Sequence, residues 1–169
     1  MRIAVLGLGL IGGSVALAAR RRLGAHVVGW DPDERALRLA EDRGALDRGI
    51  ADPAQAQDVD VWIVATPVAA LEAQVRRALR AAGEDAVVTD VGSTKRALVD
   101  AVEDLRFIGG HPLAGRERGG AVSGRADLFF GRPWVITRHP TSNDSSVRLV
   151  EDLVLDLRAV PVEMSAARQ

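Results

Sequence analysis

The segment that decides the fold is Arg2-Ile-Ala-Val-Leu-Gly-Leu-Gly-Leu-Ile-Gly12, close to the start of the chain. Its first half is a short apolar run with β-branched residues, which is typical of a strand buried on both faces of a sheet. Its second half is rich in glycine, and a helix is expected over residues 10–22, of which residues 10–19 carry no charge. The segment therefore predicts a strand, a glycine turn and a helix, in that order.

Each glycine of the turn has a predicted task. Gly7 permits the tight turn, Gly9 lets the backbone approach a pyrophosphate, and Gly12 allows the helix to pack closely on the strand. The first turn of the helix offers free N–H groups and the positive end of its dipole to phosphates. The pattern predicts a dinucleotide site formed by Gly7, Leu8, Gly9, Leu10, Ile11 and Gly12.

A carboxylate stands where such a site needs one. A second strand is expected over residues 26–30, and Asp31 follows it, 19 residues after Gly12. This is close to the interval of about 20 residues at which an acidic side chain meets the adenine ribose hydroxyls. Asp31 and the acidic residues after it would repel a 2′-phosphate, which favours NAD over NADP, although Arg35 weakens that preference. The alternative is that the glycines only tighten a turn and that Asp31 only caps the next helix.

Strands and helices alternate along the rest of the chain. Such alternation describes βαβ units, and it predicts one doubly wound α/β domain of the Rossmann type, with a mostly parallel sheet, over residues 1–162. Residues 111–131 are predicted to form a long loop with one helical turn near Asp127. The further strands are expected over 59–65, 86–90, 106–109, 134–137 and 159–162, and the further helices over 33–43, 69–82, 95–102 and 144–157.

Composition excludes several classes of protein. The 169 residues suit one domain, and 22 basic against 23 acidic side chains argue against an electrostatic nucleic-acid binder. The absence of cysteine excludes disulfides, thiolate chemistry and cysteine metal ligands, and we predict no metal site. The uncharged residues 3–19 are interrupted by glycines and too short for a bilayer span of about 20 residues. We therefore expect a cytoplasmic chain with neither a membrane nor a nucleic-acid partner.

Polar clusters follow three later strands, at the sheet edge where open α/β folds bind ligands. The first is Thr66-Pro67, the second runs from Asp90 to Lys95, and the third runs from Gly109 to Gly115. We expect Thr66, Pro67 and Asp90 to contact the cofactor. Lys95 is the only lysine of the sequence, and the simple alternative for it is a solvated surface charge.

His111 is the candidate for proton transfer. A histidine has an ordinary pKa near 6.5, which suits a general base at neutral pH. Ser93, on the neighbouring loop, could orient either the imidazole or a substrate hydroxyl. The alternatives are that His111 is a structural hydrogen-bonding group and that Ser93 or Thr94 caps the short helix after it.

Five segments carry a resemblance to a known family. They are Gly7–Ser14, Ala65–Val68, Asp90–Lys95, Gly109–Gly115 and Phe130–Val135. Together, and in this order, they resemble the prephenate and arogenate dehydrogenase family over essentially the whole chain. The resemblance implies oxidative decarboxylation of prephenate to 4-hydroxyphenylpyruvate with NAD, on the route to tyrosine, with arogenate as the alternative substrate. It also implies that His111 accepts the proton of the ring hydroxyl, and that Ser93 hydrogen-bonds the same hydroxyl.

The resemblance also implies parts that this sequence does not contain. In such enzymes a helical domain follows, forms the homodimer and contributes a basic residue that binds substrate carboxylate. Residues 163–169 would be the junction to that domain, so the chain is either a fragment or naturally truncated. Arg116 is a candidate for binding substrate carboxylate within this chain. Two other functions stay open: a nucleotide-binding module without turnover of its own, and a related hydroxyacid or 6-phosphogluconate-type dehydrogenase.

Overall fold

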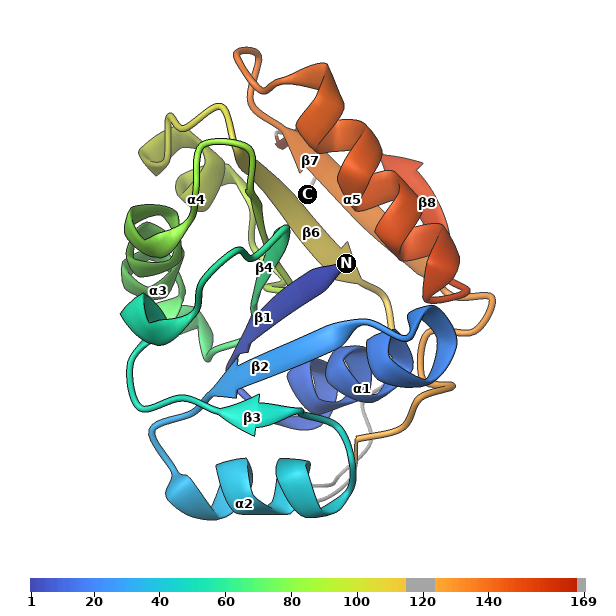
Figure 1. Ribbon diagram of the computed structural model, residues 1–169. Helices are drawn as coiled ribbons and strands as arrows, with labels where there is room; N and C mark the ends of the chain where they lie inside the picture. The colour runs from blue at the N-terminus through green and yellow to red at the C-terminus, as the bar shows by residue number, and fades with distance from the viewer. Residues whose placement is uncertain (115–123, 167–169) are drawn as a thin grey trace.

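The computed structural model describes residues 1–114 and 124–166, which form one eight-stranded sheet with helices on both faces. The strand order is β3-β2-β1-β4-β5-β6-β7-β8, and every neighbouring pair is parallel except β6 and β7 (Figure 1). The doubly wound, mostly parallel sheet is therefore confirmed. The strands are β1 (Arg2–Leu6), β2 (His26–Trp30), β3 (Arg48–Gly49), β4 (Val61–Val64), β5 (Val87–Asp90), β6 (Phe107–Pro112), β7 (Pro133–Arg138) and β8 (Val160–Glu163).

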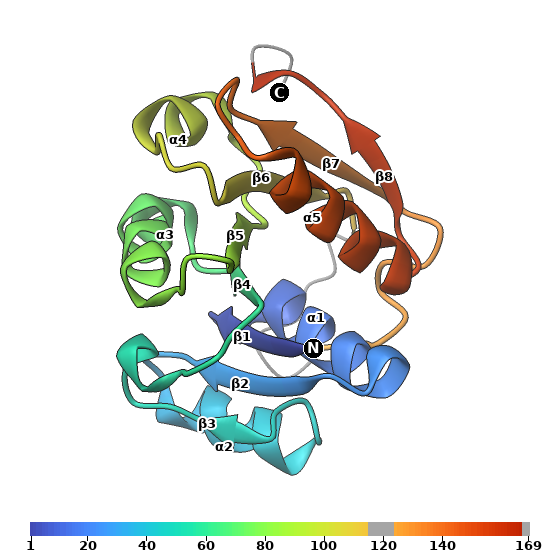
Figure 2. The same cartoon turned by 45° about the horizontal axis from the view of Figure 1, so that its top comes forward.

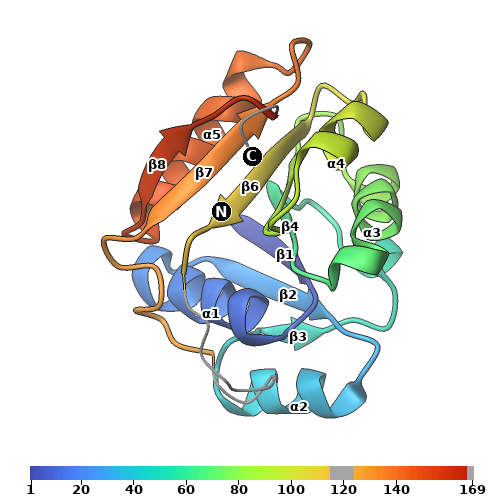
Figure 3. The ribbon, with the colours of Figure 1, turned by 180° about the vertical axis from the view of Figure 1, so that it is seen from behind.

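The helices separate into two layers because the strands are apolar on both faces. In β1, Ile3 and Val5 pack into one core, whereas Ala4 and Leu6 pack into the other. Side chains of α1, α2 and α5 belong to the first core, and those of α3 and α4 to the second. Helices α3 and α4 accordingly lie on the opposite side of the sheet from α1 and α5 (Figures 2 and 3). The helical segments are α1 (Leu10–Ala18), the π-helical η1 (Ala19–Leu23), α2 (Glu34–Asp42), the 3-10 helix η2 (Pro53–Gln55), α3 (Val68–Ala81), α4 (Arg96–Ala101) and α5 (Asp144–Asp156).

The structure corrects three details of the predicted elements. The first helix changes to π-helix at Ala19 and ends at Gly24, whose φ of +61° lies in the left-handed region. Two short segments, β3 and η2, were not predicted, since two or three residues carry no recognisable period. Strand β6 continues past the predicted end, through His111, which pairs with Val135 of β7. His111 therefore lies in a strand rather than in a loop.

The glycines of the first turn perform the structural tasks predicted for them. Gly7 has a φ of +93°, and a Cβ built there would lie 2.5 Å from the carbonyl oxygen of Ala65. A Cβ on Gly12 would lie 1.9 Å from the carbonyl oxygen of Gly7. The first turn of α1 thus lies against the ends of β1 and β4 at a distance that only glycine permits.

No helix in the described ranges is both long and apolar enough to cross a membrane.

We expect Gly12→Ala to destabilise the fold by about 2 kcal/mol, since the backbone must move to admit the methyl group. Urea unfolding followed by circular dichroism measures the change. Gly83→Ala is the matched control, because a Cβ at Gly83 would meet nothing within 4 Å. The control should stay within about 0.5 kcal/mol of the wild type. Equal stability of the two variants would contradict the close contact at Gly12.

Candidate functional site

A cavity of about 780 Å³ lies along the carboxyl ends of β1, β2, β4, β5 and β6. This is the edge at which open α/β sheets bind ligands. Residues from the glycine turn form one wall, residues after β2 and β4 form the next, and residues after β5 and at the end of β6 complete it. The predicted site residues that line this cavity are Gly7, Gly9, Leu10, Ile11, Asp31, Thr66, Pro67, Ser93 and His111.

Three predicted site residues do not line the cavity. Leu8 and Gly12 are buried in the turn, and the side chain of Asp90 is fully buried below the cavity wall. Arg116 lies outside the residues that the structure describes.

The start of α1 fits an anionic group. The helix begins at Leu10, its N-cap is Gly9, and no side chain caps it. A Cβ at Gly9 would meet nothing within 4 Å, so the space beside this residue is open. Uncapped N–H groups and the helix dipole favour a phosphate in this position.

Asp31 joins the glycine turn to the end of β2. Its Oδ2 accepts a hydrogen bond from the backbone N–H of Leu8 at 2.7 Å, and its Oδ1 accepts one from the N–H of Asp33 at 2.9 Å. Asp33, not Asp31, is the N-cap of α2, so the alternative that Asp31 only caps this helix is wrong. The carboxylate of Asp31 is held in the cavity wall, where each oxygen keeps a further lone pair for a ligand hydroxyl.

A fully buried ion pair lies below the candidate catalytic residues. Lys95 Nζ is 2.5 Å from Asp90 Oδ2 and donates a second hydrogen bond to the carbonyl oxygen of Gly92. Asp90 also accepts hydrogen bonds from the N–H groups of Gly92 and Gly110. The alternative that Lys95 is a solvated surface charge is therefore wrong, because both side chains are 0% exposed. The network connects the loop that carries Ser93 to the strand that carries His111.

Two opposing effects act on the pKa values of Asp90 and Lys95. Burial raises the pKa of Asp90 and lowers the pKa of Lys95, while their mutual attraction acts in the opposite direction on both groups. Removing one partner would leave an uncompensated buried charge, which costs more than the pair itself contributes.

His111 is half-buried at the end of β6 and faces the cavity. Burial lowers the pKa of its imidazole below the ordinary value of 6.5, and the positive charge of Lys95 lowers it further. The neutral form, which can accept a proton, therefore predominates at neutral pH. Ser93 is exposed to the same cavity. Helix α4 has Lys95 as its N-cap and no side-chain capping bond, so the capping alternatives for Ser93 and Thr94 are wrong.

Two cavity residues carry a buried polar atom without a partner. They are Thr66 Oγ1 and Gln74 Oε1, and both residues line the cavity. Unpaired buried polar atoms are rare in folded proteins, and in a cavity wall they can bond a polar ligand. Together with the glycine turn and Asp31, they fit a dinucleotide.

Sequence reasoning missed Trp30 and Gln74 in this wall. Pro67, the N-cap of α3, lines the cavity together with Ala70 and Gln74 of that helix, and the spacing of three and four residues places the three on one side. This period was the signal in the sequence that could have identified Gln74.

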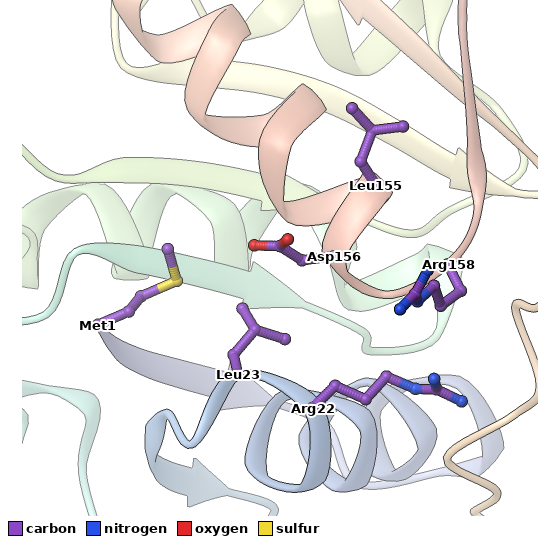
Figure 4. Close-up of a pocket in the computed structure, with 6 residues that line it drawn as sticks. All are labelled: Met1, Arg22, Leu23, Leu155, Asp156 and Arg158. Atoms are coloured by element: carbon purple, nitrogen blue, oxygen red, sulfur yellow. The ribbon is translucent and has the colours of Figure 1, made fainter.

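A second cavity of about 610 Å³ lies where η1 and α5 end (Figure 4). Met1, Arg22, Leu23, Leu155, Asp156 and Arg158 line it, and none of them lines the first cavity. None of the unpartnered buried polar atoms found in the described residues belongs to it. In residues 1–114 and 124–166, no group of three or more His, Asp or Glu side chains could hold a metal ion.

The fold and the cavity define a dinucleotide-binding domain of the Rossmann type. The family model described as "Prephenate dehydrogenase, nucleotide-binding domain" matches residues 15–163. The chain therefore belongs to the prephenate dehydrogenase family of NAD-dependent oxidoreductases, a family of tyrosine biosynthesis.

Similar proteins agree with this assignment. The prephenate dehydrogenase of Bacillus subtilis is 31% identical, over 96% of this chain and 46% of that protein. A crystal structure of prephenate dehydrogenase from A. aeolicus, in complex with hydroxyphenyl propionate and NAD+, has a TM-score of 0.92 and 29% identity, over 99% of this chain and 61% of that one. The arogenate dehydrogenase of Synechocystis has a TM-score of 0.91 and 27% identity, over 99% and 61% of the two chains. The chain spans about half the length of the curated relatives it matches.

We expect Lys95→Met to destabilise the fold by about 3–5 kcal/mol, because Asp90 is left buried without a counter-charge. The double variant Asp90→Asn with Lys95→Met should lose less stability than Lys95→Met alone, because both buried charges are removed. Urea unfolding measures both. Arg96→Met removes the same charge at the next, exposed position and should change stability by no more than about 0.5 kcal/mol. A Lys95→Met variant as stable as this control would rule out a buried ion pair.

Proposed function

We propose that this chain is the cofactor-binding half of an NAD-dependent prephenate dehydrogenase. The observation that carries the proposal is that Ser93 and His111 line the same cavity as Gly9 and Asp31. One cavity thus unites a phosphate-binding turn, a ribose-binding carboxylate and a neutral base, in a chain of the prephenate dehydrogenase family. The A. aeolicus relative has been crystallised with NAD+ and a hydroxyphenyl compound, which supports this choice of ligands.

The proposed reaction converts prephenate and NAD+ into 4-hydroxyphenylpyruvate, CO2 and NADH. Bound NAD+ would supply the hydride acceptor. His111 takes the proton of the ring hydroxyl as hydride leaves the ring carbon that bears this hydroxyl. Ser93 hydrogen-bonds the hydroxyl oxygen and orients it. The bond between the ring and its carboxylate breaks and CO2 leaves. The electron pair of that bond enters the ring, which becomes aromatic, and the former carbonyl oxygen takes the proton back from His111 as the phenol forms.

The environment of His111 sets the pH range of this step. The neutral imidazole is the active base, and its pKa is lowered by burial and by Lys95. Turnover should therefore rise as pH increases through a value below 6.5 and should already be at its plateau at neutral pH.

The proposal extends to parts outside the described site. Residues 1–162 would form the cofactor domain, and residues 163–169 would lead to a helical domain that forms a homodimer in a full-length form. Arg116 would contribute to binding substrate carboxylate. We further propose a cytoplasmic enzyme, with arogenate as the alternative substrate, because an arogenate dehydrogenase is among the similar structures.

A second candidate function is a nucleotide-binding module without turnover of its own. The observation that favours it is that the family model matching this chain describes a nucleotide-binding domain. Calorimetric titration of NAD+ into this chain, followed by an assay of prephenate-dependent NADH formation with it and with any longer form, separates the two candidates. Binding with turnover supports the dehydrogenase, binding alone in every form supports the module, and no binding contradicts both.

His111→Asn should lower turnover by at least about 100-fold, because asparagine cannot act as a general base. The dissociation constant for NAD+ should stay within about twofold of the wild-type value. The control is His139→Asn, which changes a histidine held in a turn by Thr141, outside the cavity. Near-normal turnover in His111→Asn would exclude this residue as the base.

Gly9→Ala should separate folding from binding. Its φ of −66° suits alanine and a Cβ there would meet nothing, so stability should change by no more than about 0.5 kcal/mol. The methyl group would occupy the space beside the turn, so NAD+ affinity should fall by about tenfold or more. Calorimetry and urea unfolding measure the two effects, and unchanged affinity would exclude pyrophosphate binding at this turn.

A further inference from the structure

The amide of Gln74 stands in a part of the cavity that the proposed reaction does not use. Gln74 lies one helical turn after Ala70 on α3, and both line the cavity. Three residues further along the helix, the guanidinium carbon of Arg77 lies 4.8 Å from the centroid of the Trp30 ring. This stretch of α3 therefore adjoins the end of β2, next to Asp31.

This end of the cavity is far from the candidate catalytic residues. Trp30 ends β2 and Asp31 follows it, whereas His111 lies near the end of β6. The strand order places four inter-strand steps between these two strands. At about 4.8 Å per step the separation is about 19 Å, which suits the two ends of an extended dinucleotide. With the reacting ring near His111, the opposite base of the ligand lies near Trp30 and Gln74.

The walls around Gln74 suit a flat heteroaromatic ring. Trp30, Pro32, Pro67 and Ala70 supply apolar surface, and all four line the cavity. Gln74 Oε1 is occluded from solvent and has no hydrogen-bond partner. An acceptor in that state gains a bond when a ligand donor enters or when the amide turns towards the ligand.

We propose that Gln74 recognises the adenine ring of the cofactor, with Oε1 accepting a hydrogen bond from the exocyclic amine. A primary amide matches adenine because the ring presents an amine donor beside a nitrogen acceptor, and the amide supplies the complementary pair. Gln74 thus determines specificity for the adenine base of the cofactor, while Asp31 binds the ribose. This inference rests on the proposed NAD-dependent function.

The test is a thermodynamic cycle between Gln74 and the adenine amine, measured by calorimetric binding. The ligands are NAD+ and its 1,N6-etheno analogue, in which the amine has no hydrogen to donate. The proteins are the wild type, Gln74→Met, and the control Gln57→Met, which changes an exposed glutamine outside the cavity. Because steric effects of the etheno ring occur in all three proteins, the cycle isolates the hydrogen bond.

We expect the wild type and Gln57→Met to prefer NAD+, and we expect Gln74→Met to reduce that preference by about tenfold. An unchanged preference in Gln74→Met would overturn the inference and leave the proposed function intact. Equal binding of both ligands by the wild type would also overturn the inference and leave the proposed function intact. This outcome does not depend on whether the variant folds. Failure of the wild type to bind either ligand would overturn the proposed function as well.

Discussion

The buried ion pair between Asp90 and Lys95 holds together the two segments on which the candidate active site depends. Asp90 ends β5, and its carboxylate accepts N–H groups from the loop after β5 and from β6, while Lys95 returns to it from the start of α4. The carboxylate of Asp90 thereby fixes the position of the loop that carries Ser93 relative to the strand that carries His111. No bond between Ser93 and His111 is needed for this, because both backbones are fixed from below.

The space for this pair comes from glycine. A Cβ on Gly109 would lie 3.0 Å from Lys95 Cδ, and a Cβ on Gly110 would lie 2.4 Å from the carbonyl oxygen of Asp90. The two glycines before His111 therefore let β6 approach the pair closely. The same principle operates at the other end of the cavity, where Gly12 brings α1 against the turn. Backbone contacts that exclude side chains position both the cofactor end and the catalytic end of the site.

Sequence reasoning predicted the parts of the molecule that have a period. The alternation of apolar runs gave the order of the longer strands and helices, and the glycine spacing located the turn at Gly7 and its carboxylate at Asp31. The sequence carries no comparable pattern that shows which charged side chains are buried. Asp90 was predicted as a cofactor ligand and Lys95 as a possible surface charge, and only the three-dimensional packing shows that they neutralise each other inside the fold. His111 was placed in a loop because its flanking glycines resemble loop residues, whereas the antiparallel pairing with β7 extends the strand.

The ion pair adds to the effect of burial on the candidate base, because the charge of Lys95 also lowers the pKa of His111. A carboxylate close to an imidazole favours the imidazolium form, whereas a cation favours the neutral ring. In this site burial is the larger cause of the lowered pKa of His111, and the positive charge of Lys95 acts in the same direction. The carboxylate of Asp90 accepts hydrogen bonds from Lys95 and from two backbone N–H groups, which stabilise its negative charge. Removing the positive charge of Lys95 would take away one of the two causes that lower the pKa of His111. The network that positions His111 therefore also keeps it able to accept a proton.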